Sequence, residues 1–82
     1  MNTIKEQRDG ICNDMLQAAK VFLLVYAEQG EEEYRKKVIS AMKDYAETLK
    51  NQKEYVTFCH AKNLDADEFM DEILNMSTKA IE

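Results

Sequence analysis

The near absence of helix-breaking residues constrains the fold of this chain more than any other feature. The sequence has 82 residues, no proline and only two glycines, at positions 10 and 30. Glycine and proline mark most turns and end most helices, so their scarcity leaves helices as the default structure. We therefore predict an all-α fold in a single helical domain over residues 1–82, because so short a chain cannot divide into two cores.

Apolar residues recur with helical spacing along residues 4–26 and form one wide face of an amphipathic helix. Thr3 and Glu6 have the spacing of a capping box at its start, and Gly30 suits the left-handed conformation that closes a helix. Gly10 weakens the first turns, since a glycine inside a helix costs about 1 kcal/mol relative to alanine. The helix therefore begins either at the capping box, which we favour, or after this glycine, near residue 13.

A more regular apolar stripe covers residues 34–63 and predicts a second helix. Three glutamates at positions 31–33 precede it, where the positive end of the helix dipole favours negative charge. Gln52 interrupts the stripe, and the surrounding segment, KNQKE, is polar on every side. Two interpretations stay open. The segment forms either one helix of about thirty residues, about 45 Å long, or a helix that ends or kinks at Asn51 before another begins.

The clearest boundary precedes the last helix. Asn63 can end the preceding helix, Leu64 can anchor the turn, and Asp65 with Glu68 has the spacing of a capping box. The apolar positions that follow again have helical spacing. The predicted fold is thus a three-helix arrangement, in which a helical hairpin is followed by a shorter acidic C-terminal helix.

Residues 18–27, AAKVFLLVYA, are apolar around most of a helix. One shallow contact cannot cover such a segment. A core of this size contributes little stability by itself, and the two cysteines lack the spacing of a disulfide scaffold or a zinc site. Either the other two helices cover the first helix on both sides, or a second copy of the chain completes the core. We favour a homodimer, intertwined or bundle-forming, with a monomer that buries this segment against another protein as the alternative.

No residue pattern points to catalysis, a cofactor or a metal. The sequence has one histidine, His60, two isolated cysteines, Cys12 and Cys59, and no glycine-rich loop. His60 and Cys59 are adjacent, so on a helix their side chains point about 100° apart and do not form a reactive pair. The acidic run after residue 64 lacks the central glycine of a calcium loop. We predict a non-enzymatic protein without cofactor or metal, whose cysteines are free buried thiols.

Charge and hydropathy bear on location and on partners. The N-terminal residues carry charges of both signs, and no run of eighteen apolar residues occurs, so we expect neither a signal peptide nor a membrane span. With unpaired cysteines, this predicts a cytoplasmic protein. The formal net charge of −5 disfavours direct binding to nucleic acid, which rests on Lys and Arg that displace counterions.

The predicted function is protein–protein interaction, as a small acidic helical adaptor or inhibitor. The carboxylates of the last helix match a basic surface on a partner protein, because docking there relieves their mutual repulsion. Tyrosine is enriched at interfaces because its ring is apolar and its hydroxyl can stay hydrated. The predicted partner-binding residues are Asp67, Glu68, Asp71, Glu72, Tyr34 and Tyr45.

Two alternatives remain. In the first, the carboxylates occupy a basic groove meant for nucleic acid, so that the chain inhibits its partner by mimicking phosphate charge. In the second, residues 55–74 have the apolar spacing of a helix-turn-helix, and the chain is a dimeric transcriptional regulator. The second alternative requires a basic face, although the would-be recognition helix is acidic. The lysines available for that face are Lys36, Lys37, Lys43, Lys50 and Lys53.

Overall fold

The computed structural model describes residues 3–26 and 30–81, and the side chains of residues 21–26 are not among the described atoms. The described residues form four helices and no strand: α1 (Ile4–Tyr26), α2 (Glu31–Lys50), α3 (Lys53–Ala61) and α4 (Ala66–Ile81). The all-α prediction is confirmed. The three-helix count is wrong for these residues, because the predicted second helix is divided into α2 and α3.

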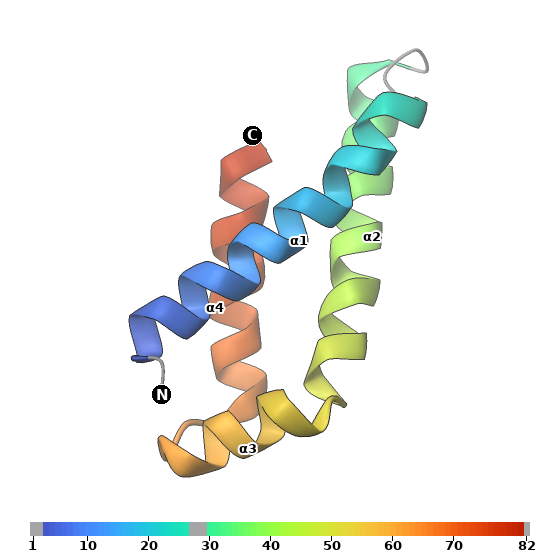
Figure 1. The fold of residues 1–82 in the computed structure, drawn as a ribbon. Coiled ribbons are helices and arrows are strands. Elements are labelled where there is room, and N and C mark those ends of the chain that lie inside the picture. Colours follow the sequence, from blue (N-terminus) through green and yellow to red (C-terminus); the bar gives the residue numbers. More distant parts are fainter. Residues whose placement is uncertain (1–2, 27–29, 82) are drawn as a thin grey trace.

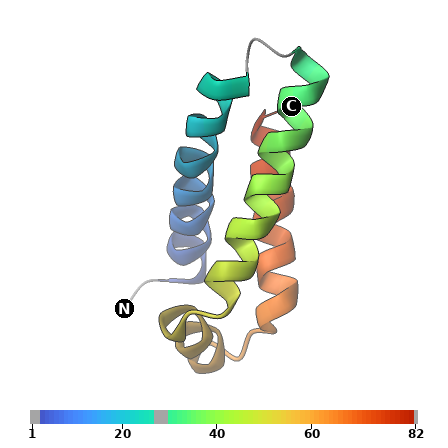
Figure 2. The same ribbon diagram turned by 90° about the vertical axis from the view of Figure 1, so that its right-hand side faces the viewer.

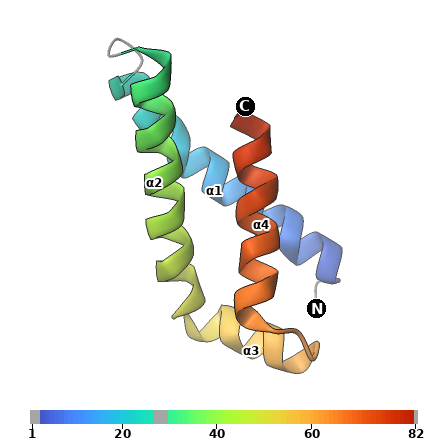
Figure 3. The same ribbon diagram turned by 180° about the vertical axis from the view of Figure 1, so that it is seen from behind.

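Three of these helices form the body of the fold. α2 and α4 run side by side, and α1 lies across one face of that pair (Figures 1 and 2). The short α3 lies across the ends of α2 and α4 and connects them, so that α4 returns along α2 (Figure 3). The result is an elongated molecule of 43 × 20 × 17 Å.

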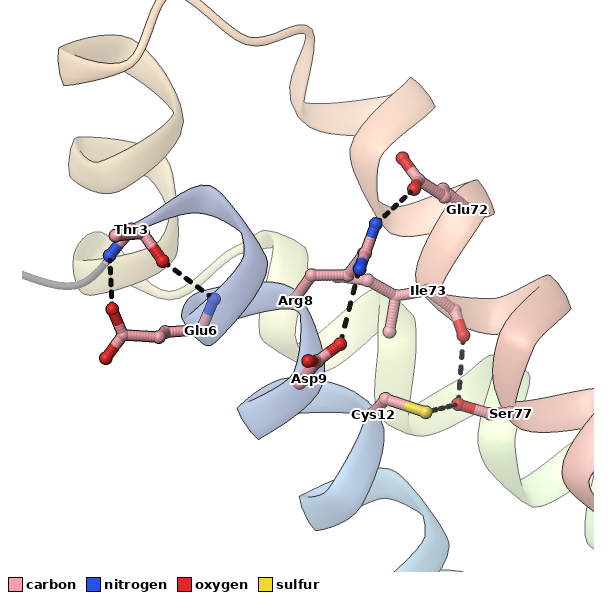
Figure 4. Close-up of polar contacts among 8 residues, drawn as sticks. All are labelled: Thr3, Glu6, Arg8, Asp9, Cys12, Glu72, Ile73 and Ser77. Atoms are coloured by element: carbon pink, nitrogen blue, oxygen red, sulfur yellow. Dashed lines mark hydrogen bonds and ion pairs between the residues drawn. The ribbon is translucent and has the colours of Figure 1, made fainter.

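The start of α1 has the predicted capping box. The Glu6 backbone N–H donates to Thr3 Oγ1 (3.1 Å), and the Thr3 N–H donates to Glu6 Oε1 (3.3 Å; Figure 4). These bonds satisfy donors that the first turn of a helix otherwise leaves unpaired. The helix therefore begins at Ile4 and continues through Gly10, which confirms the favoured start.

Gly30 has a positive φ of 100°, but its ψ of 148° is not that of the left-handed conformation predicted for it. It is the N-cap residue of α2, and the three glutamates that follow occupy the first turn of that helix, as expected. Residues 27–29 precede it and lie outside the described residues, as does the predicted closure of the first helix there. The side chains of residues 21–27, which belong to the apolar segment predicted to need burial, are also outside the described part of the structure.

The chain turns between α2 and α3 at the polar segment that interrupts the apolar stripe. The Asn51 N–H donates to the Thr48 carbonyl (3.2 Å), and the Gln52 N–H donates to the Leu49 carbonyl (3.0 Å). Gln52 itself has an extended backbone (φ −78°, ψ 135°), which ends the helical path. Of the two open interpretations, the helix that ends at Asn51 is therefore confirmed. A continuous helix is disfavoured because this segment has no apolar side chain to bury.

Asn63 ends α3 in the way that the sequence predicted. Its φ is 57°, the left-handed conformation that asparagine tolerates better than most residues. The Leu64 N–H donates to the Cys59 carbonyl (2.8 Å), and the Asn63 N–H donates to the His60 carbonyl (3.2 Å). This pair of bonds is a Schellman motif, which satisfies the last carbonyls of α3 and reverses the chain.

Two side chains hold the corner between α3 and α4. The Glu68 N–H donates to Asp65 Oδ1 (3.0 Å), which caps α4 with one of the two bonds of the predicted capping box. The Tyr55 hydroxyl donates to the Ala66 carbonyl in the first turn of α4. The Tyr55 ring lies 6.3 Å, between centroids, from the ring of Phe69. The corner thus joins a polar cap on the outside to aromatic packing on the inside.

The core lies where α1, α2 and α4 meet. Its fully buried side chains come from all three helices, and three of the five largest are methionines. Methionine is unbranched and flexible, so it fills the irregular space between helices that cross at different angles. These five residues are Met15, Val38, Met42, Met70 and Ile73.

The polar side chain of Ser77 is buried within this core. The Ser77 hydroxyl donates to the Ile73 carbonyl (2.9 Å), and its oxygen lies 3.2 Å from Cys12 Sγ on α1 (Figure 4). Since the hydroxyl has partners, its burial carries little penalty. Cys12 and Cys59 are both buried and free, as predicted.

We predict opposite effects for two substitutions at Asn63. Asn63→Ala lowers the free energy of unfolding by about 1 kcal/mol, because an alanine side chain is strained at positive φ and cannot form local hydrogen bonds. Asn63→Gly leaves stability unchanged or raises it, because glycine adopts this conformation without strain. Urea unfolding of both variants measures the difference. Equal stabilities would contradict the assignment of Asn63 as the residue that ends α3.

Tyr55→Phe tests the corner between α3 and α4. Loss of the hydrogen bond to Ala66 lowers the free energy of unfolding by about 1 kcal/mol at neutral pH. Burial raises the pKa of Tyr55 above its usual value of 10.0. The contribution of this phenol is therefore complete below pH 10 and is lost as the pH rises further, where the unfolded state ionises first. Urea unfolding at increasing pH above 10 should show a smaller loss of stability for the variant than for the wild type.

Candidate interaction surface

α4 carries a row of acidic side chains on its exposed side. Its buried positions are mainly apolar and face α1 and α2, whereas carboxylates fill the exposed positions of its first two turns. The carboxylates thus lie on a capped helix whose opposite side packs against the core. We call it the acidic face; its members are Asp67, Glu68, Asp71 and Glu72.

Two members of the acidic face form ion pairs with other helices. Arg8 Nη1 of α1 lies 3.2 Å from Glu72 Oε1 (Figure 4), and Lys50 Nζ of α2 lies 3.1 Å from Asp67 Oδ1. The pKa of Arg8 is raised chiefly by its hydrogen bond to Glu72, and that of Lys50 by hydrogen bonds to Glu47 and then Asp67. Because both carboxylates are exposed and the pairs are screened by solvent, the pairs orient side chains more than they stabilise the fold.

The other two members lack such neutralisation. Among the described residues, no cation lies within ion-pair distance of the Glu68 or Asp71 side chains. Both lie one helical turn from another carboxylate, a spacing at which like charges repel. The acidic face therefore keeps an uncompensated negative charge between its two ion-paired ends.

A groove with a volume of about 360 Å³ lies between α1 and α2. Its floor is formed by the buried side chains of Met15, Ala19 and Met42, and small side chains widen it. Residues of α2 at helical spacing form its rim. The remaining lining residues are Ala18, Lys37, Ser40, Ala41, Asp44, Tyr45 and Thr48.

The structure separates the six predicted partner-binding residues into two groups. Tyr34 and Tyr45 lie on α2, both half-buried, and both pack against the core. Tyr45 also lines the groove, which includes no residue of α4. The four carboxylates form the acidic face on α4. The tyrosines and the carboxylates therefore lie on two different helices, α2 and α4.

Sequence reasoning missed the groove. Ala18 and Ala41 are small residues within the apolar stripes of their helices, and this was the signal available. Small residues create a groove only where two helices meet face to face. Which faces of α1 and α2 meet depends on how α4 packs beneath them, and that is a property of the whole fold.

The helix-turn-helix spacing corresponds to two real helices, α3 and α4, joined by the tight corner that the spacing predicted. The helix in the recognition position exposes the acidic face. Of the five lysines that a basic face requires, Lys50 is engaged with Glu47 and Asp67. The other four are exposed on α2 and α3.

Within the described parts of the chain, no helix is both long and apolar enough to cross a membrane. No group of three or more His, Cys, Asp or Glu side chains in these parts is arranged to hold a metal ion. His60 is exposed while Cys59 is buried, as their adjacent helical positions require. Comparisons of the chain with protein-family models, curated proteins and solved structures found no match.

If the carboxylates of the acidic face repel one another, removal of one charge should stabilise the fold. Asp71→Asn raises the midpoint of thermal unfolding by about 1–2 °C at low ionic strength, because it removes like-charge neighbours one turn away. The matched variant Glu72→Gln should show no such rise, because it also removes the ion pair with Arg8. Circular dichroism melts at low and high salt measure both. A gain that persists unchanged at high salt contradicts the electrostatic explanation.

Proposed function

We propose that this chain is a non-enzymatic protein-interaction module that docks the acidic face of α4 on a basic surface of a partner protein. The observation that carries the proposal is the uncompensated charge of Glu68 and Asp71 between two ion-paired carboxylates. A basic partner neutralises this charge and removes the repulsion along the helix, so the contact is more favourable in the complex than in the isolated chain.

The way in which α4 is held also supports docking. Phe69, Met70 and Ile73 are at most 4 % exposed, so the helix has little freedom to move relative to the core. The cap from Asp65 fixes its first turn. A partner therefore meets a row of carboxylates already in place, and binding costs little conformational entropy.

The chemistry of the partner follows from the charge. A row of carboxylates on one helix fits Lys and Arg side chains in a groove or on a flat patch, and the association should weaken with salt. In the narrower form of this proposal, the basic surface normally binds phosphates of nucleic acid, and the chain inhibits its partner by occupying that surface. Competition by duplex DNA for the partner distinguishes the narrow form from the general one.

The proposal is tested with the partner that co-purifies with the full chain, once both proteins are pure. Glu68→Gln/Asp71→Asn should weaken the complex by at least about tenfold and reduce its dependence on salt. The matched control is Glu32→Gln/Glu33→Gln, which makes the same change in charge on the exposed first turn of α2. This control should bind within about twofold of the wild type.

Two outcomes overturn the proposal. One is equal binding by the acidic-face variant and its control, which shows that the contact lies elsewhere. The other is salt-sensitive binding of the wild-type chain to duplex DNA that is lost when exposed lysines of α2 are neutralised. That result favours the transcriptional regulator instead.

A further inference from the structure

The rim of the groove between α1 and α2 carries charges of opposite sign at a regular spacing. Lys37 and Asp44 are seven residues apart, so they lie two turns apart on the same side of α2. Both are exposed and both line the groove. Between them, Ser40 and Ala41 are small and leave the helix backbone accessible to close approach.

This order of charges is self-complementary. If a second copy of α2 lies antiparallel to the first with a twofold axis between Ser40 and Ala41, Lys37 of each copy faces Asp44 of the other. The dimer therefore contains two such ion pairs, because a twofold interface repeats every contact. In a parallel arrangement, Lys37 would face Lys37 of the second copy and Asp44 would face Asp44. These like charges repel, so the antiparallel arrangement is favoured.

The position of the axis agrees with the rest of α2. The helix runs from Glu31 to Lys50, so its midpoint also falls between Ser40 and Ala41, and two antiparallel copies overlap along their full length. The small residues stand at the point of closest approach, where bulky ones would hold the helices apart. Lys37 has an interaction within its own chain, but its ammonium has three donors and can pair across the axis as well.

The amount of exposed surface is also consistent with association. The chain exposes 5700 Å², whereas a compact monomer of its mass exposes about 5,000 Å². Its radius of gyration is 13.5 Å, against about 12 Å for a compact domain of this length. The chain is therefore more extended than a compact monomer of its size and has surface that a second copy can cover.

From these observations we propose that the groove between α1 and α2 is a homodimer interface. The surface that packs against it is the same surface of a second copy, so that the two α2 helices lie antiparallel about a twofold axis between Ser40 and Ala41. The contact uses none of the acidic face, so the interface is independent of the proposed function. The dimer presents two copies of that face.

The test exchanges the signs of the charges. Asp44→Lys places a lysine opposite Lys37 of the other copy, and Lys37→Asp places an aspartate opposite Asp44. Each single variant should dimerise at least about tenfold more weakly than the wild type. An equimolar mixture of the two variants should recover dimerisation, because opposite charges then face each other in both pairs of the mixed dimer. The readout is sedimentation equilibrium over a range of concentrations, against a chain mass of 9.5 kDa.

The control is Lys43→Asp, on an exposed side of α2 outside the groove, which should dimerise like the wild type. Circular dichroism of each variant shows that the helices are retained. A wild-type chain that stays at 9.5 kDa up to about millimolar concentration overturns the proposal. So does a mixture of the two variants that associates no better than either alone. The variant Glu68→Gln/Asp71→Asn should dimerise like the wild type. The dimer proposal and the proposed function can therefore fail independently of each other.

Discussion

The rest of the structure depends on one contact, in which buried methionine side chains pack between α1 and the α2–α4 pair. We call this contact the methionine-rich seam. Met15, Met42 and Met70 come from three different helices and are each at most 2 % exposed. Helices that cross at unequal angles leave irregular gaps, which flexible thioethers fill without forcing strained rotamers. With no disulfide and no metal ligand set in the described residues, this packing supplies most of the stability.

The seam closes only because the chain reverses twice within a short stretch. Gln52 leaves the helical path and directs α3 across the end of the bundle, and Asn63 then turns the chain back. Both reversals use local backbone hydrogen bonds, so they require no buried surface of their own. Tyr55 and Phe69 join the second reversal to the core, which makes the corner part of the same cooperative unit.

The surface shows two different uses of charge. On α4, Asp67 and Glu72 form ion pairs with α2 and α1, while Glu68 and Asp71 have no ion pair with any described residue and repel neighbouring carboxylates. On α2, charges of opposite sign are spaced two turns apart along a groove. A row of one sign attracts a different molecule, whereas alternating signs about a midpoint match a second copy of the same one. The two proposed contacts thus differ in the kind of partner that they require.

Local features of the fold were determined by the sequence alone. The capping box of Thr3 and Glu6, the end of α3 at Asn63 and the cap from Asp65 depend on residues within a few positions of each other, so spacing was sufficient to predict them. The break near Asn51 was one of two interpretations. Propensity could not choose between them, because the choice depends on whether a longer helix has anything to pack against.

Only the tertiary structure decided how these elements combine. Tyr45 and the carboxylates of α4 were predicted as one set of binding residues; in the fold, Tyr45 lines a groove that α1 and α2 form, and the carboxylates lie on α4. The pairing of Arg8 with Glu72 joins residues 64 positions apart, and no local pattern encodes it. Helical periodicity specifies which side of each helix is apolar, whereas the angle and depth at which those sides meet follow from packing all of the helices together.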